Sequence, residues 1–223
     1  GMSPDDLPEE VARLHCDRTN AKQLRRAIGG RDFDVVIDNV LYTGPEAEHI
    51  VNILDGRVGR YIFTSTGQVY LVREGLTRPY SESDFEGPIM PEPEPMSYDY
   101  EEWKYGKEKR DAEMVLQEAF ETRKFPYTTI RLPMVNGERD NFLRLYGYML
   151  RIKDKGSIVV PETPDYPLRH IYVGDVVQAM MRIMENEQSL GMAFNISQDE
   201  LLTIDEFLAI VAELMGKPLE ITR

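Results

Sequence analysis

The segment YGKEK, residues 105 to 109, places a tyrosine four residues before a lysine. On a helix, Tyr105 and Lys109 would share one face, where a lysine ammonium favours the phenolate and lowers the pKa of the phenol from about 10. Such a tyrosine can exchange protons with an alcohol or carbonyl near neutral pH. The adjacent segment YEEWK repeats the spacing with Tyr100 and Lys104. Spacing alone does not separate the two pairs, and each could also be two solvated side chains on a polar helix.

Three hydroxyl side chains, Thr64, Ser65 and Thr66, end the apolar segment GRYIFTST. Ligands of open parallel sheets bind beyond the carboxyl ends of the strands. A hydroxyl of Thr66 could therefore hold a reacting oxygen beside a tyrosine. Ordinary turn chemistry at a strand end is the alternative interpretation of these residues.

The elements that must position these residues alternate between strand and helix. In chain order we expect a short strand in EVARLHCD, a helix in NAKQLRRAIGG, a strand in FDVVID, a helix in PEAEHIVNILDG and a strand in GRYIFTST. A helix over about 104–122 and a strand in YTTIRLP follow. This alternation predicts an α/β fold, in which a parallel sheet carries helices on its faces.

The last third of the chain has a more mixed pattern. Residues 1–138 are expected to form the sheet domain, and residues 139–223 a smaller mixed α/β lobe with elements that return to the sheet. The last predicted helix, TIDEFLAIVAELMG, begins with a capping-box pattern of Thr203 and Glu206.

Composition restricts the class of protein. With 39 acidic and 26 basic residues and a net charge of -13, the chain should repel polyphosphates, which disfavours nucleic acid as a partner. Its one cysteine, Cys16, cannot form an internal disulfide, and no apolar run approaches the roughly 20 residues that span a bilayer. A cytoplasmic protein without a membrane partner is expected. His15, His49 and His170 lack ligand spacing, so no metal site is predicted.

The hydroxyl strand end and the tyrosine-lysine pair occur together with a third motif. Read with RHIYVGDVVQAM, the segments FTSTGQVY and YGKEKRDAE closely resemble the extended short-chain dehydrogenase/reductase superfamily, of the NAD-dependent epimerase/dehydratase type. The family pattern is carried by Thr66, with Val-Tyr following it, and by Tyr105, Lys109 and Glu113. Gly106 supplies the small residue after the tyrosine, which the upstream pair lacks. The segments GRDFDVVIDNVLYT and GRVGRYIFTST are most similar to the branch that includes chloroplast stem-loop-binding proteins and their bacterial relatives.

This resemblance implies a Rossmann-like fold, NAD or NADP as the cofactor, and a catalytic site of Thr66, Tyr105 and Lys109. Thr66 would position the substrate oxygen and Tyr105 would exchange a proton with it. Lys109 would lower the pKa of the tyrosine and hold the nicotinamide ribose. The resemblance implies a set of cofactor-binding residues from several segments: Asp17, Arg18, Asn39, Val40, Ser65, Tyr105, Lys109 and Pro133.

The function implied is an NAD(P)-dependent oxidoreductase or isomerase of the epimerase/dehydratase type. Its substrate would be sugar-like or another small hydroxyl or carbonyl compound. Arg169 lies one position away from the family's phosphate-binding arginine, which disfavours a nucleotide sugar. The alternative is a non-catalytic or regulatory binding protein of the same fold, and RNA binding is a third hypothesis.

One family feature has no counterpart in the sequence. The glycine-rich phosphate turn, G-x-x-G-x-x-G, is not found, because Gly29 and Gly30 end a predicted helix. We therefore expect an N-terminally truncated Rossmann-like domain with weak or absent cofactor binding. Its sheet would have an open edge, which invites pairing with another chain, such as a homodimer. The stretch from Thr66 to Tyr105 is also long for the family, so an unusual active-site entrance is expected.

Overall fold

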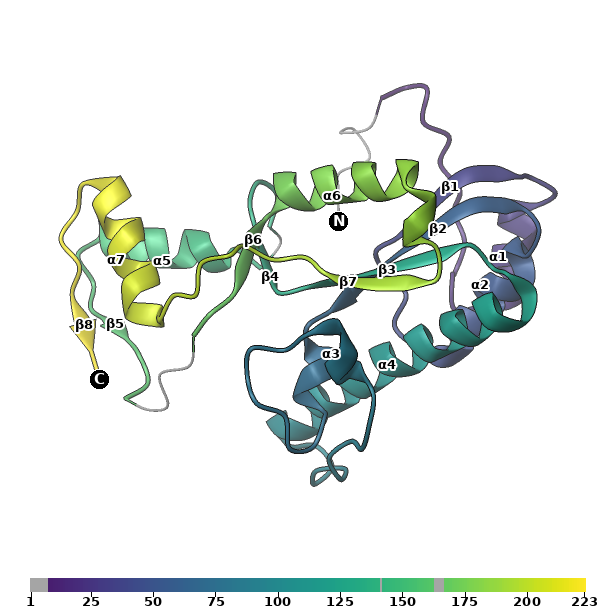
Figure 1. Ribbon diagram of the computed structural model, residues 1–223. Helices are drawn as coiled ribbons and strands as arrows, with labels where there is room; N and C mark the ends of the chain where they lie inside the picture. Colours follow the sequence, from purple (N-terminus) through teal and green to yellow (C-terminus); the bar gives the residue numbers. More distant parts are fainter. Residues whose placement is uncertain (1–7, 141, 163–166) are drawn as a thin grey trace. The chain divides into compact units, whose positions relative to one another are not determined.

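The computed structural model describes residues 8–140, 142–162 and 167–223 (Figure 1). By its contacts the chain divides into two compact units. The described residues up to Leu132 and the segment Ala179–Asn195 form the first unit, and Pro133–Gln178 with Ile196–Arg223 form the second. The sequence pattern places the division after residue 138, whereas the contacts place it after Leu132.

The first unit is built on a parallel sheet of four strands in the order β1-β2-β3-β7. These strands are β1 (Phe33–Asp38), β2 (Val58–Thr66), β3 (Tyr127–Leu132) and β7 (Met192–Asn195). The first three are rich in β-branched and aromatic residues, which suit strands covered on both faces. Because all four strands run in one direction, their carboxyl ends lie at a single edge of the sheet.

Helices flank this sheet, so the predicted α/β architecture is confirmed. One face is covered by α2 (Gly44–Leu54) and α4 (Tyr98–Arg123), with α1 (Ala21–Ile28) packed beside α2 (Figure 1). Each helix begins after a polar side chain that accepts backbone N–H groups of its first turn, namely Asn20, Thr43 and Ser97. The core between helices and sheet includes the fully buried side chains Leu54, Tyr61, Phe63, Leu116 and Phe125.

The segment that leads into β7 covers the opposite face of the sheet. It contains the last part of α6 (Val173–Glu185), on the other side of the sheet from α4, and the short 3-10 helix Glu187–Ser189 (Figure 1). Arg60 of β2 donates a hydrogen bond to Ser189 Oγ at 2.7 Å, and Thr128 of β3 donates to the Ser189 carbonyl at 2.8 Å. Ser189 therefore ties this cover to two neighbouring strands.

The strand predicted in EVARLHCD is wrong. Residues 10–17 form no strand, and the side chains of Val11 and Leu14 are exposed. A strand needs a neighbour for its backbone hydrogen bonds, and none of the described strands pairs with this segment. Among the described strands β1 pairs with β2 alone, so β1 forms one edge of the sheet.

The second unit is a smaller mixed α/β lobe. Its strands pair in parallel twos, β4 (Met134–Asn136) with β6 (His170–Tyr172) and β5 (Ile158–Val159) with β8 (Ile221–Thr222). Its helices α5 (Arg144–Lys153) and α7 (Ile204–Met215) share an apolar core that includes Ile152, Leu208 and Val211. The predicted capping box is confirmed, since Thr203 Oγ1 accepts from the Glu206 N–H and the Glu206 carboxylate accepts from the Thr203 N–H.

Helix α3 (Gln68–Leu71) approaches α4 closely at Gly106. A Cβ added to Gly106 would lie 2.8 Å from the Gln68 carbonyl oxygen and 2.8 Å from Val72 Cγ1. These distances are too short for a real contact, and a backbone carbonyl cannot move aside as a flexible side chain can. The contact explains why a glycine follows Tyr105.

We expect Gly106→Ala to lower the free energy of unfolding by about 1–3 kcal/mol, because the added methyl group overpacks the contact between α3 and α4. Gly147→Ala is the matched control, since Gly147 also lies in a helix but an added Cβ meets nothing within 4 Å. That variant should be neutral or more stable by up to ~1 kcal/mol. Denaturant unfolding measures both, and a Gly106→Ala chain as stable as the original would contradict the close approach.

Candidate active site

Tyr105 and Thr66 meet at the carboxyl edge of the sheet. Thr66 is the last residue of β2, and Tyr105 lies in the second turn of α4, after the Ser97 cap. The Thr66 hydroxyl lies close enough to the phenol of Tyr105 to influence its pKa. Tyr105 is 37% exposed, so it can be reached by a ligand. The structure thus brings together two of the three residues that the resemblance assigns to catalysis.

The pKa of Tyr105 differs from the expectation. Burial raises this pKa above its ordinary value, and the nearby Thr66 hydroxyl lowers it by less. The Lys109 ammonium is directed to backbone carbonyls instead of the phenol. The lowered tyrosine pKa that the spacing suggests is therefore not found, and Tyr105 is a neutral phenol near pH 7.

Lys109 is buried between the ends of β1 and β2, with 2% of its surface exposed. Its Nζ donates to the Leu41 carbonyl at 2.6 Å and to the Thr64 carbonyl at 3.1 Å. The rings of Tyr42 and Phe63 each lie 4.8 Å from the ammonium. Burial lowers the pKa of Lys109 to about 8, although nearby carboxylates oppose the shift.

The upstream pair has the surroundings of a solvated helix face. Lys104 is 46% exposed, and its Nζ lies 4.0 Å from Glu108, one turn further along α4. Exposed ion pairs of this kind contribute little to stability. The structure therefore separates two pairs that share one spacing, because Lys109 is buried at the strand ends and Lys104 faces solvent.

A buried network begins at Glu113, one turn after Lys109. Ser65 Oγ donates to Glu113 Oε1 at 2.5 Å, and Arg131 Nη2 donates to Glu113 Oε2 at 2.7 Å. Arg131 Nη1 donates to Tyr70 Oη, which donates in turn to Asn195 Oδ1, both at 2.7 Å. Ser65, which the resemblance assigns to the cofactor, thus directs its hydroxyl into the interior. The network joins β2, β3, β7, α3 and α4.

The long stretch that precedes α4 is anchored to the carboxyl edge at Phe85. Two buried guanidinium groups lie over its ring, Arg110 at 4.0 Å and Arg131 at 4.3 Å. Arg110 also donates to the Phe85 carbonyl at 2.7 Å. Glu82 accepts a hydrogen bond from the backbone N–H of Asn195, the last residue of β7, at 2.8 Å. Sequence reasoning missed this anchoring, since contacts between residues far apart in the chain leave no periodic signal.

Arg18 is held by Asp38 at the end of β1. Arg18 Nη1 and Nη2 donate to the two carboxylate oxygens of Asp38 at 2.7 Å each. Tyr61 Oη donates to the same carboxylate at 2.6 Å, and the Val40 N–H donates at 3.0 Å. Two of the expected cofactor residues, Arg18 and Val40, therefore gather around a carboxylate that the sequence analysis did not assign to the site.

The remaining expected cofactor residues have different surroundings. Asn39 Oδ1 accepts a hydrogen bond from Thr64 Oγ1 at 2.7 Å, between the ends of β1 and β2. Asp17 Oδ1 accepts from the backbone N–H of Thr19 at 3.0 Å and from its hydroxyl at 2.7 Å, in an exposed turn before α1. Pro133 directly follows β3 and is the first residue of the second unit.

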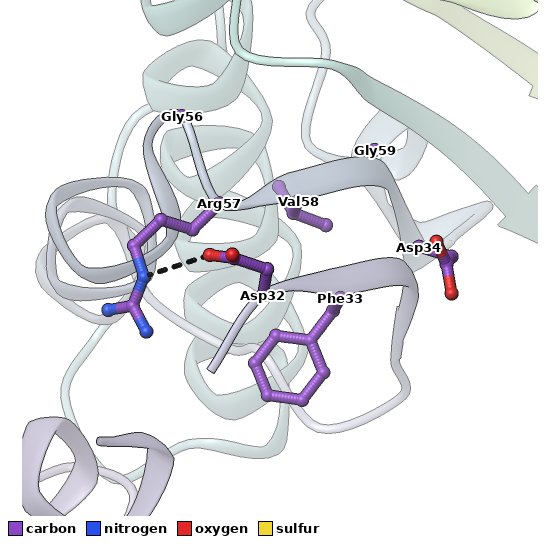
Figure 2. A pocket seen from close by; sticks show the side chains of 7 residues that line it. All are labelled: Asp32, Phe33, Asp34, Gly56, Arg57, Val58 and Gly59. Atoms are coloured by element: carbon purple, nitrogen blue, oxygen red, sulfur yellow. Dashed lines mark ion pairs between the residues drawn. The ribbon is translucent and has the colours of Figure 1, made fainter. Parts of the chain in front are cut away.

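An open depression lies at the opposite end of the sheet (Figure 2). Residues 32–34 and 56–59 line it, at the amino ends of β1 and β2. Across it Arg57 Nε lies 3.6 Å from Asp32 Oδ1, and this aspartate is 83% exposed. Since ligands of parallel sheets bind at the carboxyl ends of strands, the edge with Tyr105 is the better candidate.

In the described part of the chain, no group of three or more His, Cys, Asp or Glu residues could hold a metal ion. No helix there is long and apolar enough to cross a membrane.

Comparison with known proteins identifies the class to which this fold and site belong. Residues 3–197 match the model of the NAD dependent epimerase/dehydratase family. The chain therefore belongs to this family, as the motifs around Thr66 and Tyr105 predict.

Particular relatives agree with this assignment. The chain is 23% identical over 215 residues to the chloroplast stem-loop binding protein of 41 kDa b from Arabidopsis thaliana, covering 96% of this chain and 51% of that protein. It thus spans about half the length of this relative. The fold is similar to that of UDP-glucose 4-epimerase from Thermotoga maritima, with a TM-score of 0.75, 17% identity, and 99% and 74% of the two chains covered. A dTDP-glucose 4,6-dehydratase from Bacillus anthracis, in complex with NAD, gives a TM-score of 0.72, 16% identity, and 93% and 66% coverage.

The residues at the carboxyl edge fit part of a dinucleotide. Lys109 carries three N–H donors, of which two bind the Leu41 and Thr64 carbonyls. Tyr105 is accessible at the same edge. Asn39 and Val40 follow the end of β1 there, where Asn39 is bonded to Thr64 and the Val40 N–H to Asp38. Lys109 and Tyr105 are the residues that would hold the ribose of a nicotinamide cofactor.

Lys109 should give the chain a distinct dependence of stability on pH. Its pKa is about 8 in the folded chain against an ordinary value of 10.5, so between these values the folded chain binds fewer protons than the unfolded chain. The free energy of unfolding should rise with pH through this window, by on the order of 3 kcal/mol, as the cost of burying the ammonium disappears. Chemical denaturation at a series of pH values measures the rise.

Lys109→Met, with an uncharged side chain, should abolish this rise. Lys104→Met is the control and should retain it, because Lys104 is exposed. If the original chain and Lys109→Met share one pH profile, Lys109 is not a buried ammonium.

Proposed function

We propose that the chain carries the acid-base site of an NAD(P)-dependent sugar-modifying oxidoreductase or isomerase, formed by Thr66, Tyr105 and Lys109. The observation that supports this most directly is the proximity of Thr66 and Tyr105 at the carboxyl edge, one helical turn from the buried Lys109. Family membership supports the class of reaction, as do the sugar epimerase and dehydratase of similar fold.

In this proposal Tyr105 moves a proton between its hydroxyl and the substrate oxygen. Because burial raises its pKa, Tyr105 is protonated near neutral pH and donates its proton when a carbonyl is reduced. In the reverse direction the phenolate accepts the proton. Thr66 orients the substrate oxygen. When bound, the nicotinamide cofactor would supply or receive the hydride.

The proposed substrate is sugar-like or another small alcohol or carbonyl compound. The two structures of similar fold are named for UDP-glucose and dTDP-glucose, so these sugar nucleotides are the first probes. Free sugars are the second probes, since the position of Arg169 disfavours a nucleotide sugar.

The test compares Tyr105→Phe with Tyr100→Phe, which removes the hydroxyl of the rival pair. Turnover of the probes with NAD⁺ and NADP⁺ is measured for this chain and for a version extended upstream through a glycine-rich loop. Tyr105→Phe should lower turnover by about 10²–10⁴-fold, because a phenyl ring cannot transfer a proton. Tyr100→Phe should leave turnover close to that of the original.

Full turnover by Tyr105→Phe would refute the assigned acid-base residue. Calorimetric titration with NAD⁺ and NADP⁺ is the second measurement. Cofactor binding without turnover of any probe, by both versions of the chain, would favour the non-catalytic alternative.

A further inference from the structure

Asp38 is a heavily bonded carboxylate at the carboxyl edge of the sheet. It is the last residue of β1, is 8% exposed, and accepts four hydrogen bonds. Two come from the Arg18 guanidinium and one from the Tyr61 hydroxyl. The fourth comes from the backbone N–H of Val40, two residues further along the chain. Such a bond from an aspartate to the second following N–H fixes a tight turn.

This turn leads directly to Lys109. Leu41 follows Val40, is completely buried, and its carbonyl accepts the shorter of the two Lys109 hydrogen bonds. A continuous set of contacts therefore runs from Arg18 through Asp38 and the turn to the lysine. Asp38, Leu41 and Lys109 are each at least nine-tenths buried, and Val40 lies within the turn. Arg18 closes the outer end of this set and is 22% exposed.

We propose that Asp38 is a positioning residue for Lys109. Braced by Arg18 and Tyr61, Asp38 fixes the turn that presents the Leu41 carbonyl, and its negative charge holds the lysine as an ammonium. This inference rests on the proposed function only in that Lys109 is taken as the lysine of the active site. Arg18 restrains the Asp38 carboxylate, and its own positive charge opposes the effect of Asp38 on the lysine.

The charges that face Lys109 come from each element around it. Asp38 on β1, Glu113 on α4 and Glu46 on α2 favour the ammonium, and Arg18 before α1 disfavours it. Asp38 is the largest of the favourable contributions. The two partners of one ion pair therefore act on the lysine in opposite directions. A variant that only loosens the fold would not shift the pKa of Lys109 in both directions, because greater exposure always moves the pKa of a buried lysine toward its ordinary value.

The experiment follows the titration of Lys109 by NMR, with carbon-13 at the ε position of lysine and Lys109→Met to identify its signal. In Asp38→Asn the pKa of Lys109 should fall below the value of about 8 in the original chain. In Arg18→Gln it should rise above that value. Asp32→Asn is the matched control, because it removes the same charge just before the other end of the same strand. It should leave the pKa of Lys109 unchanged.

Opposite shifts in the two variants, with none in the control, would support the proposal. An unchanged pKa in Asp38→Asn would overturn it, and so would a rise toward 10.5, because Lys109 would then have been exposed rather than deprived of a charge. The titration needs neither cofactor nor substrate. If both pKa shifts are found but Tyr105→Phe keeps full turnover, this inference therefore stands and the proposed function does not.

Discussion

The buried ion pair between Glu113 and Arg131 is the interaction on which the rest of the candidate site depends. It fastens α4, which carries Tyr105 and Lys109, to β3 in the interior of the sheet. Loss of either partner would leave an unpaired charge away from water, at a cost of about 3–5 kcal/mol. Ser65 of β2 donates a hydrogen bond to the same carboxylate, so β2 is held against the helix as well.

Between residues 109 and 113, helix α4 buries charged side chains instead of apolar ones alone. Lys109, Arg110 and Glu113 are all nearly inaccessible, whereas Leu116, further along the same helix, packs in the apolar core. Lys109 and Arg110 donate to backbone carbonyls, and Glu113 pairs with Arg131. Buried charges are costly unless they are fully hydrogen-bonded, so their concentration near the strand ends indicates a site that is held in a defined geometry.

The parallel sheet and its helices could be predicted because their signals are local. FDVVID and GRYIFTST are apolar enough to be strands covered on both faces. The helix predicted from about residue 104 begins earlier, at Tyr98, after the Ser97 cap. EVARLHCD also contains apolar residues, yet it forms no strand. Pairing depends on a neighbouring strand, which a segment cannot supply by itself. The same limit applies to Phe85 and Arg131, whose contacts join distant parts of the chain.

The sequence by itself determined the family, the alternation of helix and strand from NAKQLRRAIGG to YTTIRLP, and the two motifs at the end of β2 and within α4. These follow from residue types at short spacing, which a chain carries whether or not it is folded. Only the tertiary structure decided which lysine of the two pairs is buried, that the hydroxyl of Ser65 points to Glu113 and not to the edge, and that the Leu41 carbonyl, just after the turn at Asp38, binds Lys109. Burial and charge at a given atom depend on every segment packed around it, and those segments meet only when the chain folds.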